Sequence, residues 1–206
     1  MKKPIVIGIT GGIGSGKTTV AEILRANGFD VYNSDVEAKR LQNENTNIRK
    51  KITELFGQEI YKNVGLDRRE LATLVFGNPI LLDKLNAIVH PVVIEDFMNW
   101  KQNHLNKKYV FLESAVLFES GFNLFTDKIM LITANENIRI KRVMERDGFT
   151  EEQVRMRMNN QLSDEQRMEF VDAVINTDMG PPTIIELKKI ISDFSCKKYS
   201  IKKLYI

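Results

Sequence analysis

Eight consecutive residues, Gly11-Gly12-Ile13-Gly14-Ser15-Gly16-Lys17-Thr18, fill the pattern G-x-x-x-x-G-K-[ST]. An apolar run from Pro4 to Thr10 precedes them, and an amphipathic pattern from Thr18 to Ala26 follows them. The apolar run is typical of a buried parallel strand, and the amphipathic pattern predicts a helix. This order of strand, glycine-rich loop and helix indicates an α/β fold with a mainly parallel sheet.

The residue types of this loop suit the phosphates of a nucleotide. Its glycines let the backbone turn tightly and aim N–H groups at phosphate oxygens, at the N-terminus of a helix. Lys17 can reach the β- and γ-phosphates, and the Thr18 hydroxyl can ligate Mg²⁺. We therefore expect ATP and Mg²⁺, with Thr18 as the metal ligand and Lys17 acting in catalysis. The residues expected to bind the nucleotide are Gly12, Ile13, Gly14, Ser15, Gly16, Lys17, Thr18 and Thr19.

The alternative is a glycine-rich turn that only links a strand to a helix. It leaves the Lys-Thr pair and both flanking patterns unexplained.

Four more apolar segments read as strands and complete a five-stranded, doubly wound sheet. They are Phe29 to Asn33, Tyr109 to Glu113, Lys128 to Thr133 and Ala173 to Asn176. Residues from about 36 to 105 hold no convincing strand. They hold helical patterns instead, over Ile48 to Phe56, over Asp67 to Phe76, and in a long helix opened by Asn78-Pro79 and interrupted at His90-Pro91.

We therefore expect a three-layer P-loop NTPase fold in three parts. Residues 1–35, 106–138 and 168–206 form the nucleotide-binding core. Residues 36–105 form a helical insertion that binds the acceptor, by analogy with enzymes of this architecture. Residues 139–167 form an arginine-rich helical lid, whose helices begin at reciprocal caps, Thr150 with Gln153 and Ser163 with Gln166.

Asp35 follows the second predicted strand. In an open α/β sheet the ligand crevice lies outside the carboxyl ends of the strands, which places this carboxylate near the γ-phosphate. There it can accept the proton of an attacking hydroxyl or orient a metal-bound water. The alternative is an N-cap for the helix expected over Val36 to Leu41.

Five arginines recur between residues 139 and 157: Arg139, Arg142, Arg146, Arg155 and Arg157. The first three are spaced to share one helix face and could close over the transferring phosphoryl group. The alternative for any one of them is a solvated helix face. Glu113, at the end of the third predicted strand, has two candidate roles: assisting the metal through water, or pairing with a lid arginine.

Several of these segments together resemble the dephospho-CoA kinase family. They are residues 8–21, Asn33-Ser34-Asp35, His90-Pro91, Leu117-Phe118-Glu119, residues 141–147, and Val174-Ile175 with the two residues that follow. The match covers most of the chain in one order and fades after about residue 195. Two departures are visible, because the family commonly has Asp where this chain has Asn33, and Pro where it has Ala115.

The resemblance implies transfer of the ATP γ-phosphoryl group to the ribose 3′-hydroxyl of dephospho-CoA, the last step of coenzyme A synthesis. By this similarity Asp35 is the base and Arg142 a lid arginine near the phosphates, and both act in catalysis with Lys17. Asp35, His90 and Glu119 are expected to contact the acceptor.

Two other functions compete with this one. Another P-loop kinase, acting on a nucleoside monophosphate or a sugar acid, would share the phosphate site and differ in its acceptor. A nucleotide-dependent switch fits poorly, because the sequence has neither Asn-Lys-x-Asp for guanine nor Asp-x-x-Gly for a γ-phosphate sensor.

Composition limits the partners. Thirty Lys and Arg against 27 Asp and Glu give a net charge of +3, too small an excess to indicate nucleic acid. No run approaches the roughly 20 apolar residues that span a bilayer, so we expect no membrane partner. The single cysteine, Cys196, fits a reducing cytoplasm. The sequence leaves the oligomeric state open.

Overall fold

The computed structural model describes residues 3–75, 78–195 and 204–205. The chain divides into two compact units, one formed by residues 1–33 with 104–206 and the other by residues 34–103. The first unit holds the glycine-rich loop, and the second holds the helices that follow the second strand.

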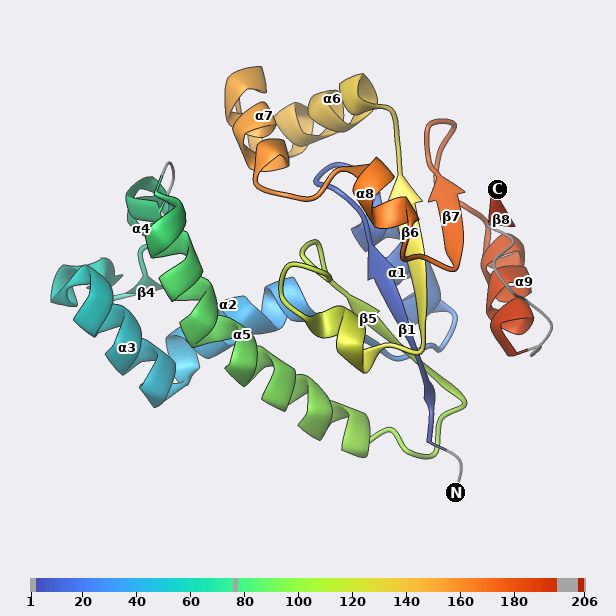
Figure 1. Cartoon of the computed structure of the whole chain (residues 1–206), viewed down its shortest axis with the longest axis horizontal. Coiled ribbons are helices and arrows are strands. Elements are labelled where there is room, and N and C mark those ends of the chain that lie inside the picture. The colour runs from blue at the N-terminus through green and yellow to red at the C-terminus, as the bar shows by residue number, and fades with distance from the viewer. Residues whose placement is uncertain (1–2, 76–77, 196–203, 206) are drawn as a thin grey trace. The chain divides into compact units, whose positions relative to one another are not determined.

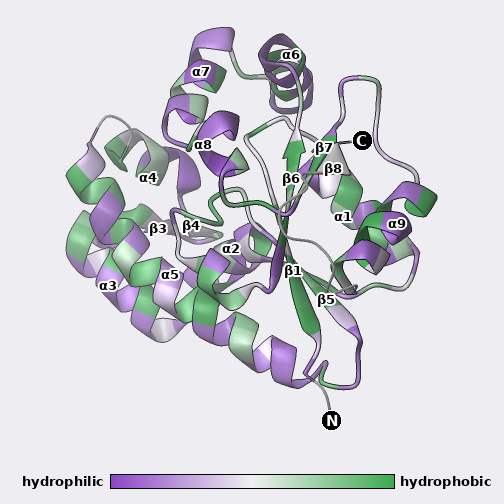
Figure 2. Cartoon of the chain, turned by 45° about the vertical axis from the view of Figure 1, so that its right-hand side comes forward, coloured by the Kyte–Doolittle hydropathy of each residue, from purple (hydrophilic) through white to green (hydrophobic). Residues whose placement is uncertain are grey.

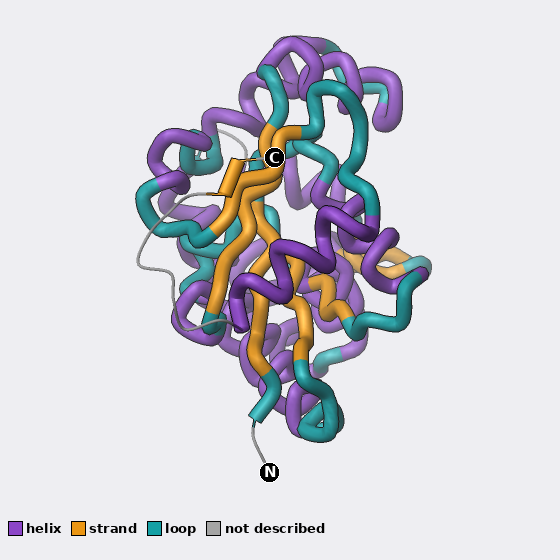
Figure 3. The backbone as a smooth tube through the Cα atoms, turned by 90° about the vertical axis from the view of Figure 1, so that its right-hand side faces the viewer, coloured by secondary structure: helices purple, strands orange, loops and turns teal. Residues whose placement is uncertain are grey.

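A parallel sheet forms the centre of the first unit (Figures 1 and 3). Its order is β2 (Val31–Asn33), β5 (Tyr109–Glu113), β1 (Ile5–Thr10), β6 (Lys128–Thr133), β7 (Ala173–Asn176) and β8 (Leu204–Tyr205). Every pairing in it is parallel. The predicted five-stranded sheet is confirmed. β8, a strand of two residues that the sequence analysis did not predict, pairs with β7 at the edge.

Both faces of this sheet are covered. Helices α1 (Lys17–Ala26) and α9 (Ile184–Ser195) supply Val20, Leu24, Leu187 and Ile190 to a core with Ile7 and Ile9 of β1, a strand that is hydrophobic along its length (Figure 2). On the other face, a Cβ added at Gly8 would lie 3.1 Å from Leu117 and from Thr126, in the segment that contains the short helix η2 (Phe122–Phe125). The sheet is therefore the middle of three layers, as predicted.

Three short helices follow at the carboxyl end of the sheet, where the loop after β1 also lies (Figure 1). They are α6 (Glu136–Asp147), α7 (Glu151–Asn159) and α8 (Asp164–Met168). Both predicted capping boxes are confirmed, with Thr150 accepting from the Gln153 amide and Ser163 from the Gln166 amide. Gly148 ends α6 with φ 69°, a left-handed conformation that glycine adopts without strain.

The second unit consists mainly of helices. They are α2 (Ser34–Glu44), α3 (Thr46–Phe56), η1 (Gln58–Ile60), α4 (Arg68–Val75) and α5 (Pro79–Gln102). The expectation of no strand here is wrong, because β3 (Tyr61–Lys62) and β4 (Gly65–Leu66) pair as an antiparallel hairpin. Strands of two residues are too short to show the alternating pattern by which strands are predicted. Phe76, the predicted end of the helix begun near Asp67, lies outside the described residues.

Helix α5 begins as predicted, with Asn78 as its N-cap accepting from the Leu81 amide and Pro79 as its first residue. The predicted interruption at His90-Pro91 is wrong, because the helix continues through Pro91 to Gln102. Its buried residues, Leu85, Val89, Val93 and Phe97, recur every four positions on both sides of the proline. Their packing holds the two halves as one helix, although Pro91 removes one backbone hydrogen bond.

Candidate phosphate-binding site

The glycine-rich loop joins β1 to α1 as predicted. Gly16 stands at the N-cap of α1 in a left-handed conformation with φ 94°, and no side chain caps this end of the helix. Lys17, largely buried, turns back across the loop, and its Nζ donates to the Gly12 carbonyl at 3.2 Å. Uncapped N–H groups at a helix start, with a lysine folded over the loop, form a nest for an anion.

The Ser15 hydroxyl also lies in this loop. It is buried and has no hydrogen-bond partner within the described part of the chain. A buried donor without a partner is costly, and a phosphate oxygen would satisfy it.

Thr18 and Glu113 meet at the carboxyl ends of the neighbouring strands β1 and β5. The Thr18 hydroxyl donates to Glu113 Oε1 at 3.0 Å, and Asn33 Nδ2 donates to Glu113 Oε2 at 2.7 Å. Glu113 is buried and forms an ion pair with Arg25 of α1 at 3.6 Å, an arginine outside the lid segment. One carboxylate therefore links the loop, the end of β2 and the first helix.

Two of the five lid arginines contact the loop. Arg142 Nη2 donates to the Thr177 carbonyl at 2.7 Å, while its Nη1 donates to the Thr177 hydroxyl at 2.9 Å and makes a long contact of 3.5 Å with the Gly14 carbonyl. The Thr177 hydroxyl in turn donates to the Ser15 carbonyl at 2.8 Å. Arg142 is thus held beside the loop through Thr177, a residue to which sequence reasoning gave no role.

Arg139 contacts the loop more closely. Its Nε donates to the Ile13 carbonyl at 3.0 Å, and its Nη1 pairs with Asp164 at 3.3 Å. Burial lowers the pKa of Arg139, and the nearby Asp164 carboxylate acts in the opposite direction. The guanidinium stays protonated, because the pKa of arginine is far above neutral pH.

The other three arginines bind partners outside the loop; Arg146 and Arg155 are exposed, and Arg157 is half-buried. Arg146 pairs with Asp147, Arg155 pairs with Glu136 and Glu151, and Arg157 lies 3.8 Å from the centre of the Phe149 ring. For these three, the alternative of a solvated helix face describes the structure better.

Glu119 lies in the first unit, after β5. Its Oε1 accepts from the Leu162 amide at 3.0 Å and pairs with Arg167 Nη2 at 3.4 Å. Arg167 is completely buried and also pairs with Asp164 at 3.2 Å. Glu119 therefore ties the segment after β5 to the end of the lid segment.

Asp35 and His90 belong to the second unit. Asp35 is the second residue of α2, so its position in the first turn differs from the N-cap position considered for it. Its chain neighbour two residues earlier is Asn33, which contacts Glu113. His90 lies half-buried in the middle of α5.

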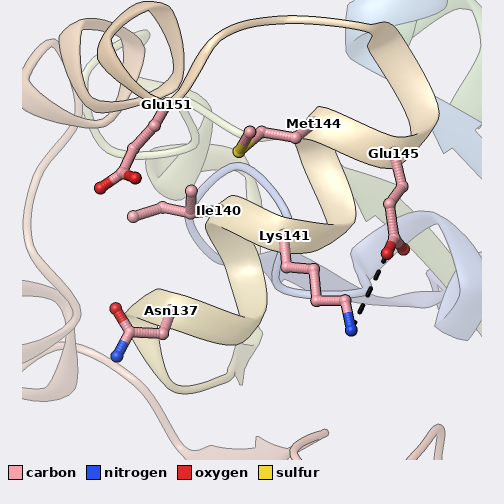
Figure 4. Close-up of a pocket in the computed structure, with 6 residues that line it drawn as sticks. All are labelled: Asn137, Ile140, Lys141, Met144, Glu145 and Glu151. Carbon is pink, nitrogen blue, oxygen red and sulfur yellow. Dashed lines mark ion pairs between the residues drawn. The ribbon is translucent and has the colours of Figure 1, made fainter.

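A separate cavity of about 390 Å³ opens between α6 and α7 (Figure 4). It is lined by Asn137, Ile140, Lys141, Met144, Glu145 and Glu151. Lys141 and Glu145 form an ion pair across 3.9 Å, and no residue of the glycine-rich loop reaches the cavity. It is therefore distinct from the phosphate site.

A parallel sheet with this loop, its lysine, and basic side chains at the carboxyl end of the sheet is the arrangement of a P-loop phosphotransferase. The family model for dephospho-CoA kinase (CoaE) matches residues 5–182. The chain belongs to the dephospho-CoA kinase family, and it is an ATP-dependent kinase.

Two similar proteins carry the name of this family, and a solved structure is similar over nearly the whole chain. A dephospho-CoA kinase of Porphyromonas gingivalis is 43% identical over 157 residues, which cover 76% of this chain and 77% of that protein. One of Bacteroides fragilis is 37% identical over 188 residues, covering 91% and 92%. The crystal structure of TT1252 from Thermus thermophilus is 35% identical with a TM-score of 0.78, covering 97% of this chain and 100% of that one.

A shikimate kinase from Acinetobacter baumannii shares the fold alone, at 16% identity and a TM-score of 0.54 over 95% and 96% of the two chains. No helix within the described residues has both the length and the apolar character needed to cross a membrane.

Proposed function

We propose that the chain transfers the γ-phosphoryl group of ATP to the ribose 3′-hydroxyl of dephospho-CoA and releases CoA and ADP. The observation that carries this proposal is the family match over residues 5–182, which includes the loop of the phosphate site. In the reaction the hydroxyl oxygen forms a bond to the γ-phosphorus, and the bond from that phosphorus to the β,γ-bridging oxygen breaks.

The loop and two side chains supply the phosphate contacts. Apart from the Ile13 N–H, which Gln161 binds, backbone N–H groups between Gly12 and Thr19 surround the phosphates, and Lys17 moves from the Gly12 carbonyl to the β- and γ-phosphates. Arg142 offsets the charge that develops on the transferring group. Its position beside the Gly14 carbonyl and Thr177 supports this role.

The donor set fits Mg²⁺. The Thr18 hydroxyl would hold the ion directly, and Glu113, 3.0 Å from that hydroxyl, would hold it through water. Magnesium takes oxygen ligands and usually keeps several waters, so one hydroxyl and one carboxylate are sufficient when phosphates supply the rest. When bound there, Mg²⁺ would supply positive charge that offsets the charge of the phosphates.

On the acceptor side, the family resemblance gives contacts with the acceptor to Asp35, His90 and Glu119. It makes residues 36–105 the acceptor-binding insertion and residues 139–167 the lid. Asp35 takes the proton from the 3′-hydroxyl as that oxygen attacks. This role is supported by its place at the end of β2, where ligands of open α/β sheets bind.

The cytoplasmic location stays a prediction. Cys196, the residue on which it rests, lies outside the described residues.

The first test is acceptor specificity. ADP formation from Mg-ATP is measured with dephospho-CoA, adenosine, AMP and gluconate, and the product is identified by its mass. We expect strong stimulation by dephospho-CoA alone, with CoA as the product, and loss of turnover in Lys17→Ala. Stimulation by another acceptor would favour a different P-loop kinase, and slow hydrolysis indifferent to acceptors would favour a switch.

The second test is the base. Asp35→Asn should lower kcat by about 10²–10⁴-fold, the usual contribution of a general base, and change the KM for ATP little. Glu54→Gln, an exposed carboxylate on α3, serves as the matched control and should keep the full rate. A near-normal kcat in Asp35→Asn would leave Asp35 with a structural role.

A further inference from the structure

Both backbone polar groups of one loop residue, Ile13, are bound by side chains of the lid segment. The Ile13 N–H donates to Gln161 Oε1 at 2.9 Å, and the Ile13 carbonyl accepts from Arg139 Nε at 3.0 Å. Arg139 lies in α6 and Gln161 lies between α7 and α8, so the two contacts come from separate parts of residues 139–167. We call Ile13, Arg139 and Gln161 the Ile13 clamp.

The clamp fits the loop tightly. A Cβ added at Gly12 would lie 1.8 Å from Arg139 Nη2, and one added at Gly14 would lie 2.5 Å from the Arg139 carbonyl. The backbone of α6 thus requires glycine at position 14, and the guanidinium of Arg139 fills the space that a side chain at position 12 would need.

The arginine of the clamp is itself held in place. Asp164, buried below Arg139, accepts from Arg139 Nη1 at 3.3 Å and from Arg167 Nη1 at 3.2 Å. Arg167 is completely buried and pairs with Glu119. Because Arg139, Asp164 and Arg167 are buried, these three side chains have little freedom to change partners.

An anion-binding nest depends on the orientation of successive peptide groups, because the N–H groups must converge on one point. A rotation of the peptide groups on either side of Ile13 would turn neighbouring N–H groups away from that point. Side chains that fix the N–H and the carbonyl of Ile13 together prevent such a rotation.

We propose that Gln161 and Arg139 are positioning residues that hold the loop at Ile13 in its phosphate-binding conformation. The lid segment then contributes to ATP affinity before any acceptor binds. This inference rests on the proposed function of the loop as the ATP site, and it assigns to Gln161 a role that the sequence analysis missed.

The test removes the side-chain oxygen of Gln161 that accepts the hydrogen bond and keeps the shape of the side chain. Gln161→Met has nearly the same length and no amide oxygen, Gln161→Ala also loses the packing, and Asn160→Ala, an exposed neighbour, is the matched control. The dissociation constant of ATP is measured by calorimetry without acceptor, together with the KM for ATP and kcat. We expect Gln161→Met to weaken ATP binding and raise this KM about fivefold, the factor for one hydrogen bond of about 1 kcal/mol, with kcat changed little.

A spectroscopic measurement reports on the contact itself. Hydrogen exchange of the Ile13 amide, followed by NMR, should be faster in Gln161→Met and slow in Gln161→Glu, whose carboxylate also accepts this N–H. If Gln161→Met does not fold, the exchange rate of the Ile13 amide and the ATP affinity are measured in Gln161→Glu and compared with those of the unsubstituted protein.

The clamp would be overturned if Gln161→Met bound ATP as tightly as the unsubstituted protein, including the case in which Gln161→Ala weakens ATP binding and Met restores it fully. It would also be overturned if the Ile13 amide exchanged at the same rate in Gln161→Met as in the unsubstituted protein. Failure of the unsubstituted protein to bind ATP would overturn the proposed function together with the clamp. Normal ATP affinity with another acceptor would leave the clamp standing and overturn only the acceptor assignment.

Discussion

The inner and outer arginines of the lid segment differ in what holds them. Arg139 and Arg142, on the inner face of α6, donate to backbone carbonyls of the loop or of Thr177, and Arg139 also pairs with the buried Asp164. Arg155 and Arg157, on α7, bind partners on exposed helix surface. Two arginines on α6 therefore help to organise the phosphate site, whereas the arginines on α7 bind partners on the helix surface.

Environment explains this difference. A buried guanidinium loses its hydration and must find several acceptors in fixed positions, whereas an exposed one exchanges its partner for water at little cost. Substitutions that remove inner contacts should therefore have large effects, and those that remove outer contacts small ones.

The largest expected effect is at Asp164, between Arg139 and Arg167. Asp164→Ala leaves two buried cations facing each other without their shared anion, and should lower the free energy of unfolding by about 3–5 kcal/mol. Urea denaturation measures this loss. Asp147→Ala, which breaks the outer pair with Arg146, is the control and should cost about 1 kcal/mol or less. If both variants lost the same free energy of unfolding, inner and outer ion pairs would not differ in their contribution to stability.

Next comes Arg142, expected to act on catalysis more than on stability. Arg142→Ala should lower kcat by about 10²–10³-fold, as for loss of one charge-stabilising donor. Arg142→Lys should restore little, because an ammonium cannot donate in a fork to the hydroxyl and the carbonyl of Thr177. Steady-state kinetics with saturating ATP gives the comparison, and full activity in the Lys variant would show that charge alone is needed.

A smaller effect is expected at Arg157, which stacks on Phe149 at the lid surface. Arg157→Ala should lower the free energy of unfolding by about 1 kcal/mol, a typical value for a cation–π contact that is partly exposed, and leave kcat unchanged. Thermal and urea unfolding together measure it. A large fall in kcat would move Arg157 from the outer group to the inner one.

The smallest effect is expected at Arg155. Arg155→Ala removes ion pairs to Glu136 and Glu151 on exposed surface, and neither Tm nor kcat should change measurably. The measurement is repeated at low and high salt, since any contribution from these pairs should disappear as salt screens them. A salt-independent loss of activity would contradict the assignment of Arg155 to the solvated face.

The parts of the molecule that sequence predicted are those with local signals. The five strands carry apolar runs, the loop carries its glycines and Lys17, and the caps at Thr150 and Ser163 act within three residues. Local spacing expresses these features completely, so the chain need not be folded to recognise them.

The parts that sequence did not predict depend on distant partners. Gln161 meets Ile13 across 148 positions, and Asn33 meets Glu113 across 80. No local sequence pattern around Gln161 or Asn33 predicts these contacts. The prediction at Pro91 is wrong for a related reason, because packing along α5 on both sides outweighs the local preference of proline to end a helix.

The two glycines beside Ile13 face different evolutionary constraints. At Gly12 the obstacle to a side chain is the tip of Arg139, so a shorter residue at position 139 could appear first and make room for a later change. At Gly14 the obstacle is the backbone carbonyl of residue 139, which every amino acid possesses, and φ is 79° there. A residue larger than glycine can therefore be accepted at position 12 in lineages where position 139 changes first. At position 14, no replacement of residue 139 makes room for a side chain.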